Sequence, residues 1–255
     1  MHSSPIYLFL IFVASVIAGV MNAVAGGGRL VAFPALLFAG VPPIMANATS
    51  SLGVWPSGLT SGWVYRKYID TPRRTIILLI VGSIAGSFLG AFLLLHTPEH
   101  IFERLIPPML IFAALLFSFS GHIRRMAERM AIPAGSLVVM GVAGQFAIAI
   151  YGGYFGAGMG VLMLSLFSVT LSTKIHSMNG LRAFCMTAVN ATAVVVFIFG
   201  HRIDWWFAAV MAIGATIGST AGALGMRRLS PVIARRIVLV LAWGMTIAYV
   251  AKMGI

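Results

Sequence analysis

Long apolar runs follow one another along almost the whole chain, and they limit its possible folds more than any other feature. Each run has about 20 residues, the length that an α-helix needs to cross a hydrocarbon core of ~30 Å. The composition agrees, because 60% of the 255 residues are hydrophobic and only 9% are charged. A typical soluble domain has about 25% charged residues to cover its surface. We therefore predict an all-α integral membrane protein with many crossings.

The basic charge of the chain is distributed as in a membrane protein. Seventeen Lys and Arg against five Asp and Glu give a net charge of +12, which in a soluble protein would indicate nucleic-acid binding. Here the basic residues lie in short gaps between apolar runs, where they hold loops on the cytoplasmic side. The expected partner is therefore the lipid bilayer and not a nucleic acid. The single cysteine, Cys185, excludes a disulfide within the chain.

The first half of the sequence returns in the second half, which predicts two homologous halves, residues 1–125 and 126–255. The strongest match joins 82–91, GSIAGSFLGA, to 214–223, GATIGSTAGA, with five of ten positions identical. We expect the polar stretch Gly121–Met130 to be the linker. Three shorter matches lie at similar displacements: Gly26-Gly27-Gly28 with Gly156-Ala157-Gly158, Ala46-Asn47-Ala48 with Met178-Asn179-Gly180, and Ile69-Asp70 with Ile203-Asp204.

Each half contains apolar segments in the same order: a long helix that ends in a glycine turn, a short segment, and three further helices. This pattern gives about ten membrane segments, or eight full crossings if the short segments only re-enter the bilayer. We interpret residues 6–25 as a retained membrane helix, because no Lys or Arg precedes it as in a signal peptide. The other predicted segments are 30–40, 45–65, 75–95 and 105–120, then 136–160 including its glycine cluster, 161–171, 178–199, 205–225 and 237–252.

The arginine content of the loops predicts that the two halves are inverted. Loops 65–74, 121–130 and 226–236 are rich in Arg, whereas 96–104 and 200–204 have one Arg each. If the rich loops are cytoplasmic, then loop 65–74 and its repeat partner 200–204 lie on opposite sides. Such inversion needs an odd number of crossings in each half. Inverted repeats are typical of secondary transporters, whose substrate site lies near the bilayer midplane at the repeat interface.

The glycine clusters between apolar segments are candidate anion sites. Glycine permits a sharp turn with exposed N–H groups, and the next segment then begins with free donors and a positive dipole end. Irregular backbone at this depth requires surrounding protein or water. The alternative is a tight turn without a ligand. The clusters consist of Gly26, Gly27 and Gly28 in the first half, and of Gly156, Gly158 and Gly160 in the second.

Polar side chains near each cluster supply further candidate anion ligands. Amide, hydroxyl and guanidinium groups can all donate to an oxyanion, and an ionisable residue inside a membrane segment indicates function. Arg182 is the sharpest candidate, although snorkelling to the interface is an alternative for it. The predicted set consists of Arg29, Asn47, Thr49 and Ser50 in the first half, and of Asn179 and Arg182 in the second.

The remaining ionisable residues predict little chemistry. His176 is a possible proton relay, because histidine titrates near neutrality, but a lone His near a helix start more often has a capping or interfacial role. We expect Asp70 to pair with a neighbouring Arg, and Asp204 to pair with Arg202. No catalytic triad, carboxylate pair or metal-ligand cluster is evident, so we expect neither an enzyme nor a cofactor or metal.

Taken together, these motifs resemble the two repeats of the sulfite exporter TauE/SafE family, over residues 10–245 or so. Two positions depart from the pattern: Arg29 stands where a small residue is usual, and Leu164 stands where the first half has Pro34. The first half carries Gly26-Gly27-Gly28, Pro34 and Ala46-Asn47-Ala48-Thr49-Ser50, and the second carries residues 152–160, Asn179-Gly180-Leu181-Arg182 and residues 197–204.

The resemblance implies a multi-pass permease or exporter of the inner (plasma) membrane. Members of the family are linked to sulfite, sulfoacetate, taurine breakdown and other organosulfur anions. We therefore expect a transporter of small sulfur-containing anions, such as sulfite or organosulfonates. The alternative is a non-transporting membrane subunit that anchors or assembles a partner. The exact substrate, the direction of transport, the coupling ion and the oligomeric state stay open.

Overall fold

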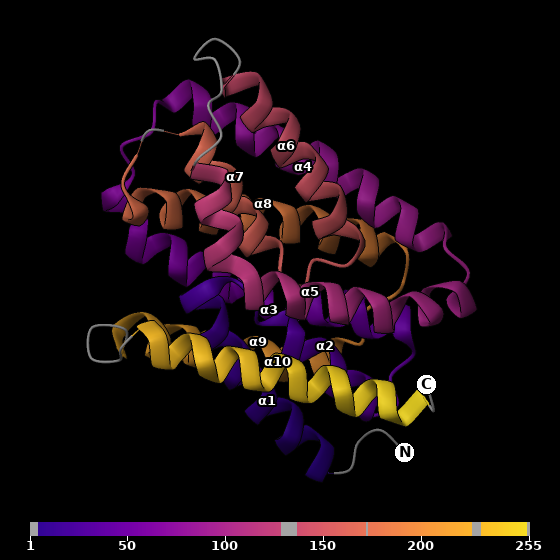
Figure 1. The fold of residues 1–255 in the computed structure, drawn as a ribbon. Helices are drawn as coiled ribbons and strands as arrows, with labels where there is room; N and C mark the ends of the chain where they lie inside the picture. Colours follow the sequence, from indigo (N-terminus) through magenta and orange to yellow (C-terminus); the bar gives the residue numbers. More distant parts are fainter. Residues whose placement is uncertain (1–4, 129–136, 172, 226–230, 254–255) are drawn as a thin grey trace.

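The computed structural model describes residues 5–128, 137–171, 173–225 and 231–253, and these ranges contain helices but no strands (Figure 1). The order of long and short helices repeats from one half to the next. The first half contains α1 (Pro5–Ala25), α2 (Arg29–Phe38), α3 (Pro43–Tyr65), the 3₁₀ turn η1 (Arg66–Tyr68), α4 (Arg73–His96) and α5 (Glu99–Glu128). The second contains α6 (Leu137–Tyr154), α7 (Met159–Thr170), α8 (Ile175–Phe199), α9 (Trp205–Gly225) and α10 (Pro231–Met253).

Among the described residues, six helices are long and apolar enough to cross a membrane: α1, α4, α5, α6, α8 and α9. This confirms the predicted all-α membrane protein. Helix α3 has a similar length of 23 residues, but it carries many buried Asn, Ser and Thr side chains that lower its hydropathy. Helices α2 and α7 have 10 and 12 residues, so they span only about 15 and 18 Å, roughly half of the hydrocarbon core.

Several helices are longer than the sequence predicted, and the predicted loops shrink accordingly. The expected loop 121–130 is helical to Glu128, because Arg, Met, Ala and Glu are good helix formers; its remainder lies outside the described residues. The predicted boundary at 125/126 therefore falls inside the last turn of α5. The expected loop 96–104 is reduced to Thr97–Pro98, because proline favours the start of a helix.

The glycines of the matching segments 82–91 and 214–223 pack against helices of the other half. Helix α9 lies along α1, and a Cβ added at Gly218 would overlap the carbonyl oxygen of Val16. Helix α4 lies along α6, where a Cβ at Gly90 would overlap the carbonyl oxygen of Ile150. These glycines therefore allow the two backbones to touch, as small residues do in membrane helix pairs. The halves are interlaced and not merely adjacent.

We expect Gly218→Ala to destabilise the protein by about 1–3 kcal/mol, because the added methyl group forces α9 away from α1. Gly244→Ala is the matched control, since nothing lies within 4 Å of a Cβ at that exposed position of α10. Thermal unfolding in detergent should show a lower midpoint for Gly218→Ala alone. Equal midpoints for both variants would contradict the close packing of α1 and α9.

The directions of neighbouring helices follow from residue contacts. Helix α3 runs antiparallel to α8, because Gly58 faces Thr187 whereas Gly62, further along α3, faces Phe184. Both α1 and α3 run parallel to α9, so α2 must return the chain between them. In the same way α6 and α8 run parallel to α4. The equivalent helices of the two halves thus point in opposite directions, which supports the predicted inversion.

Loop contacts at the two ends of the bundle agree with these directions. At one end, Thr173 donates to Asp70, and the rings of Tyr68 and His176 lie 5.6 Å apart. At the other end, Arg202 Nη1 lies 4.0 Å from Glu99 Oε2, and the Ile44 amide donates to Glu99 Oε1 at 3.3 Å. Loop 65–74 is therefore at the opposite end of the bundle from loop 200–204.

We predict that cysteines at positions 68 and 201 react with a membrane-impermeant thiol reagent from opposite sides. Both native side chains, Tyr68 and His201, are exposed. Each would be introduced separately in a Cys185→Ser background, so that one thiol is present at a time. Residue 68 lies in the Arg-rich loop and should react from the cytoplasmic side. Labelling of both positions from one side would contradict the inverted arrangement.

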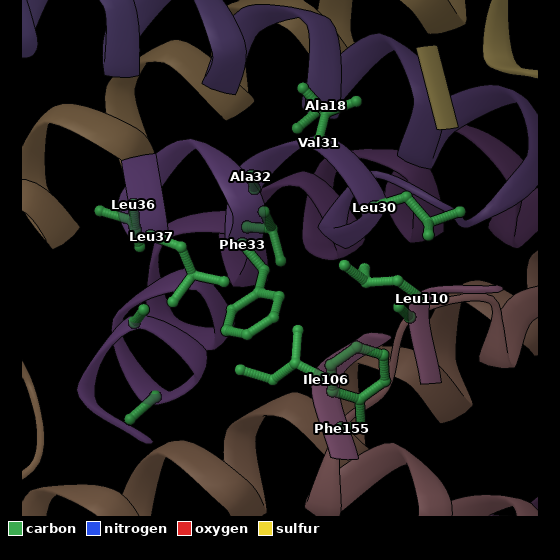
Figure 2. Packing of buried hydrophobic residues seen from close by; sticks show 14 of the residues in the cluster. Ala18, Leu30, Val31, Ala32, Phe33, Leu36, Leu37, Ile106, Leu110 and Phe155 are labelled. Atoms are coloured by element: carbon green, nitrogen blue, oxygen red, sulfur yellow. The ribbon is translucent and has the colours of Figure 1, made fainter. Parts of the chain in front are cut away.

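The short helix α2 is enclosed by protein. Eight of its ten residues are buried, and Figure 2 shows its side chains packed against residues of α5 and against Phe155. The Phe33 ring lies 5.5 Å from that of Phe155 and 6.4 Å from that of Phe102, with edge-to-face geometry. This core shields a half-length helix from lipid, so its ends can carry irregular backbone at membrane depth.

Candidate functional site

The two glycine turns meet at the interface between the halves. Gly26, Gly156 and Gly158 have φ values of 74°, 78° and 81°, which L-residues with a Cβ rarely adopt. A Cβ added at Gly26 would lie 3.1 Å from the Cα of Gly160. The end of α1 therefore touches the start of α7 with no side chain between them. The two predicted clusters therefore lie together where the halves meet.

Arg29 reaches from the first glycine turn to the second. Its Nη2 donates to Asn47 Oδ1 at 2.5 Å and to the Asn47 carbonyl at 3.3 Å. Its Nη1 lies 3.4 Å from the Gly152 carbonyl of α6, and a Cβ at Gly156 would overlap that nitrogen. The Asn47 side chain also donates to the Tyr154 carbonyl at 2.9 Å. Arg29 and Asn47 therefore join the first half to the glycine turn of the second.

Arg182 reaches in the opposite direction, from α8 to the first glycine turn. A Cβ placed on Gly26 would lie 2.6 Å from Arg182 Nη1 and 3.1 Å from the sulfur of Met186. The Arg182 side chain is only 1% exposed, so it does not snorkel to the surface. Its Nε and Nη1 have no hydrogen-bond partner. The guanidinium is thus held at the turn with donors free for a ligand.

The two guanidinium groups give the site a strongly positive electrostatic character. Arg29 is 3% exposed, and its Nε also lacks a partner. Of the four acidic residues whose side chains the structure describes, none forms an ion pair with either arginine. A buried charge without a counterion costs several kcal/mol. An anion bound between the turns would reduce that cost and accept from the free donors.

The other predicted site residues divide into two groups. The first supports the turn: the Gly28 amide donates to Asn22 Oδ1 at 3.0 Å, and a Cβ at Gly27 would overlap the Phe117 ring. Ser50 donates to the Asn47 carbonyl at 2.9 Å, and Thr49 accepts from the Asp204 amide at 3.0 Å. These groups are therefore occupied by contacts within the protein.

The second group lies near the start of α8, away from the turn. Asn179 is half-buried and donates back to the Ile175 carbonyl at 3.1 Å. His176 is exposed beside Tyr68, and six residues separate it from Arg182, or about 9 Å along the helix axis. The roles of His176 in proton relay and of Asn179 in substrate binding stay predictions. Within the described residues, the hydrogen bond of Asn179 is made to Ile175 and the ring contact of His176 to Tyr68.

The two repeat-related aspartates have contacts that the sequence did not predict. Asp204 accepts from the amides of Trp206 and Phe207, both at 3.1 Å, and so caps α9, while Arg202 pairs with Glu99. Asp70 accepts from Thr173. Hydrogen bonds with Ser177 and Thr173 lower the pKa of Asp70. The expected partner of Asp204, Arg202, is therefore engaged elsewhere, and both aspartates join loops to the opposite half.

Asn22 is a member of the site that the sequence analysis missed. Its side chain is 8% exposed, accepts from the Gly28 amide, and donates to Ser57 Oγ at 2.8 Å. It thereby fixes the first glycine turn against α3. A signal was present, because an Asn near the end of an otherwise apolar membrane helix needs a buried partner. The Gly152 and Tyr154 carbonyls, in contrast, have no signature in the sequence.

The fold and this site define a polytopic membrane protein with a polar centre between two related halves. The chain belongs to the sulfite exporter TauE/SafE family, whose family model matches residues 11–249. No solved structure matches the chain.

Curated relatives agree with a transport class. A "Probable membrane transporter protein" of Haemophilus influenzae is 27% identical over 248 residues, covering 97% of this chain and 96% of the relative. The "Probable membrane transporter protein YfcA" of Escherichia coli K12 is 26% identical, with coverages of 86% and 80%. YunE of Bacillus subtilis, similarly described, is 27% identical, with coverages of 91% and 94%. The likeness therefore extends over nearly the whole chain.

Proposed function

We propose that this protein transports small sulfur-containing oxyanions across the inner (plasma) membrane, and that the anion binds between the two glycine turns. The observation that supports this most is the pair of buried guanidinium groups that cross between the halves. Arg182 has two unpartnered nitrogens and Arg29 has one. Donors of this kind, buried without a carboxylate, suit an anion better than a cation or a neutral solute.

The two arginines have different parts in this proposal. Arg29 is held by three contacts with protein acceptors, so it positions the second turn and contributes charge. Arg182 makes fewer contacts and supplies the free donors that approach the anion directly. The two residues are not equivalent in the repeat, since one starts α2 and the other lies within α8. The binding site is thus asymmetric although the scaffold is repeated.

Several features support sulfur oxyanions as the substrate class. The family description names sulfite export. Sulfite and sulfonates present several oxygens around one centre, which matches the forked geometry of a guanidinium group. Antiparallel equivalent helices would allow the halves to rock around the fixed turns and expose the site alternately to each side.

A binding titration on the purified protein tests the proposal. Sulfite, sulfate, thiosulfate and a short alkylsulfonate would be compared with acetate and with a small organic cation at matched ionic strength. We expect saturable binding of at least one sulfur anion, weaker binding of acetate and none of the cation. Binding that is absent for all four sulfur anions, or equal for anion and cation, would contradict an anion site.

A further inference from the structure

A lateral groove lies on the seam between the two halves, separate from the glycine turns. It has a volume of about 510 Å³ and runs between α3 and α8. Its walls include Gly58, Leu59, Gly62 and Trp63 of α3, and Phe184 and Thr187 of α8. Phe184 is two residues from Arg182, which places the two side chains on nearly opposite faces of α8. The groove therefore opens outward while the arginine points inward.

The groove is apolar and its size suits a small ligand or a lipid chain. Binding pockets for such molecules usually measure about 300–1,000 Å³. Trp63 is 67% exposed and Leu59 is 49% exposed along it. The absence of a side chain at Gly62 leaves space, since a Cβ there would lie 3.8 Å from the Phe184 ring. An apolar chain could lie in this space in contact with both halves.

One arginine, Arg66, lies at the end of the groove. The Arg66 guanidinium lies 3.3 Å from the centre of the Trp63 ring, and Arg66 Nη1 donates to the Trp63 carbonyl at 2.7 Å. Lys67 follows in η1, and Arg73 and Arg74 begin α4; all three are exposed. Asp70, the one acidic residue between Arg66 and Arg74, accepts from Thr173. The mouth of the groove is therefore cationic.

A second groove at the opposite end of the bundle lacks this cationic rim. It measures about 360 Å³ between α4 and α8, with Phe92, His96, Val195 and Phe199 among its lining residues. It corresponds to the first groove in the repeat, because the third helix of each half forms one wall. The nearest arginine along the chain, Arg202, pairs with Glu99. Comparing lipid binding at the two grooves therefore separates the contribution of the arginine from that of the apolar lining.

We propose that an anionic phospholipid binds the first groove, with an acyl chain between α3 and α8 and its phosphate beside Arg66. Basic clusters at the cytoplasmic end of membrane helices attract anionic headgroups, and the Arg-rich loop identifies this end as cytoplasmic. The lipid would contact both halves at their seam. The proposal does not depend on the identity of the transported anion.

Lipid retention by the full-length protein tests this site. The protein would be exchanged into vesicles containing equal amounts of phosphatidylglycerol and phosphatidylcholine with identical chains, then extracted gently and analysed for bound lipid. We expect the wild type to retain phosphatidylglycerol preferentially, by about fivefold for one arginine at an anionic surface. Arg66→Gln should remove the preference, whereas Gly62→Leu should fill the groove and reduce retention of both lipids.

Two matched variants serve as controls. Arg104→Gln removes an exposed arginine outside the Arg-rich loop, and Val195→Phe fills the second groove; both should retain lipid as the wild type does. The proposal would be overturned if the wild-type protein showed no headgroup preference. It would also be overturned if Arg104→Gln lost the preference as Arg66→Gln does. Displacement of the lipid by millimolar inorganic phosphate would overturn it too, because it would indicate a site for free phosphate.

Discussion

Replacing Arg182 by Ala should reduce the affinity for the transported anion by at least about 30-fold. A desolvated charge contact is worth about 2–5 kcal/mol when one partner is removed, and about 1.4 kcal/mol corresponds to a factor of ten. Arg182→Lys keeps the charge but loses the planar fork, so it should recover only part of the affinity. Titration of sulfite against the three proteins measures the effect directly. Equal affinity of the Lys and Arg forms would show that the planar fork of the guanidinium group does not contribute to anion binding.

Thermal stability separates this binding role from a structural role. Arg182 is buried with two unpartnered nitrogens, so its charge should destabilise the empty protein. We expect Arg182→Met, which keeps an apolar chain in that space, to unfold at a higher temperature than the wild type without anion. Added sulfite should raise the midpoint of the wild type but not that of Arg182→Met. A lower midpoint for the variant would indicate that Arg182 is chiefly structural.

Gly156→Ala should abolish most transport, whereas Gly158→Ala should leave it largely intact. Both glycines have φ near +80°, so both substitutions carry a similar backbone cost of about 1–2 kcal/mol. The Cβ at position 156 overlaps the Arg29 guanidinium and lies 2.7 Å from the Gly152 carbonyl oxygen; at position 158 the nearest atom is 3.4 Å away in Ala113. The pair therefore separates the crowding of Arg29 and the Gly152 carbonyl from the backbone strain that both variants share.

Initial flux into proteoliposomes, normalised to the amount of inserted protein, measures this difference. Thermal midpoints would verify that the two variants are destabilised to a similar extent. Equal loss of flux in both variants would show that turn strain dominates, and unimpaired flux in Gly156→Ala would exclude Arg29 from the site.

Much of the fold follows from sequence patterns that have a simple physical cause. Apolar length identified the membrane helices, and the internal repeat identified the order of long and short elements. The matching glycines of 82–91 and 214–223 marked the two faces where backbones touch. Prolines such as Pro98 start helices, so the ends of α4 and α5 lie closer together than hydropathy alone indicated. Boundaries were less predictable because charged helix formers extend α5 beyond its apolar part.

The residue types of the candidate site could be predicted from the sequence, but the contacts between these residues could not. Arg29 and Arg182 were recognisable as candidates, because a charged residue inside an apolar membrane segment is costly and is therefore usually functional. Their crossing between the halves was not, since it depends on how α2 and α8 pack in three dimensions. Asn47 and Asn179 match in the repeat, yet Asn47 accepts a hydrogen bond from Arg29 whereas Asn179 donates back to the Ile175 carbonyl of its own helix. The first is enclosed by protein, whereas the second lies half-buried near the start of α8.

Uptake of sulfite by proteoliposomes containing the purified protein tests the central claim most directly. Wild-type protein should give saturable flux above that of empty liposomes, with competition by other sulfur oxyanions, and Arg182→Ala should reduce it to the background. The Gly244→Ala variant, which is changed at an exposed position of α10, should insert into the liposomes and transport sulfite as the wild type does. Wild-type flux equal to that of empty liposomes for every sulfur anion, in either direction of the gradient, would contradict the account.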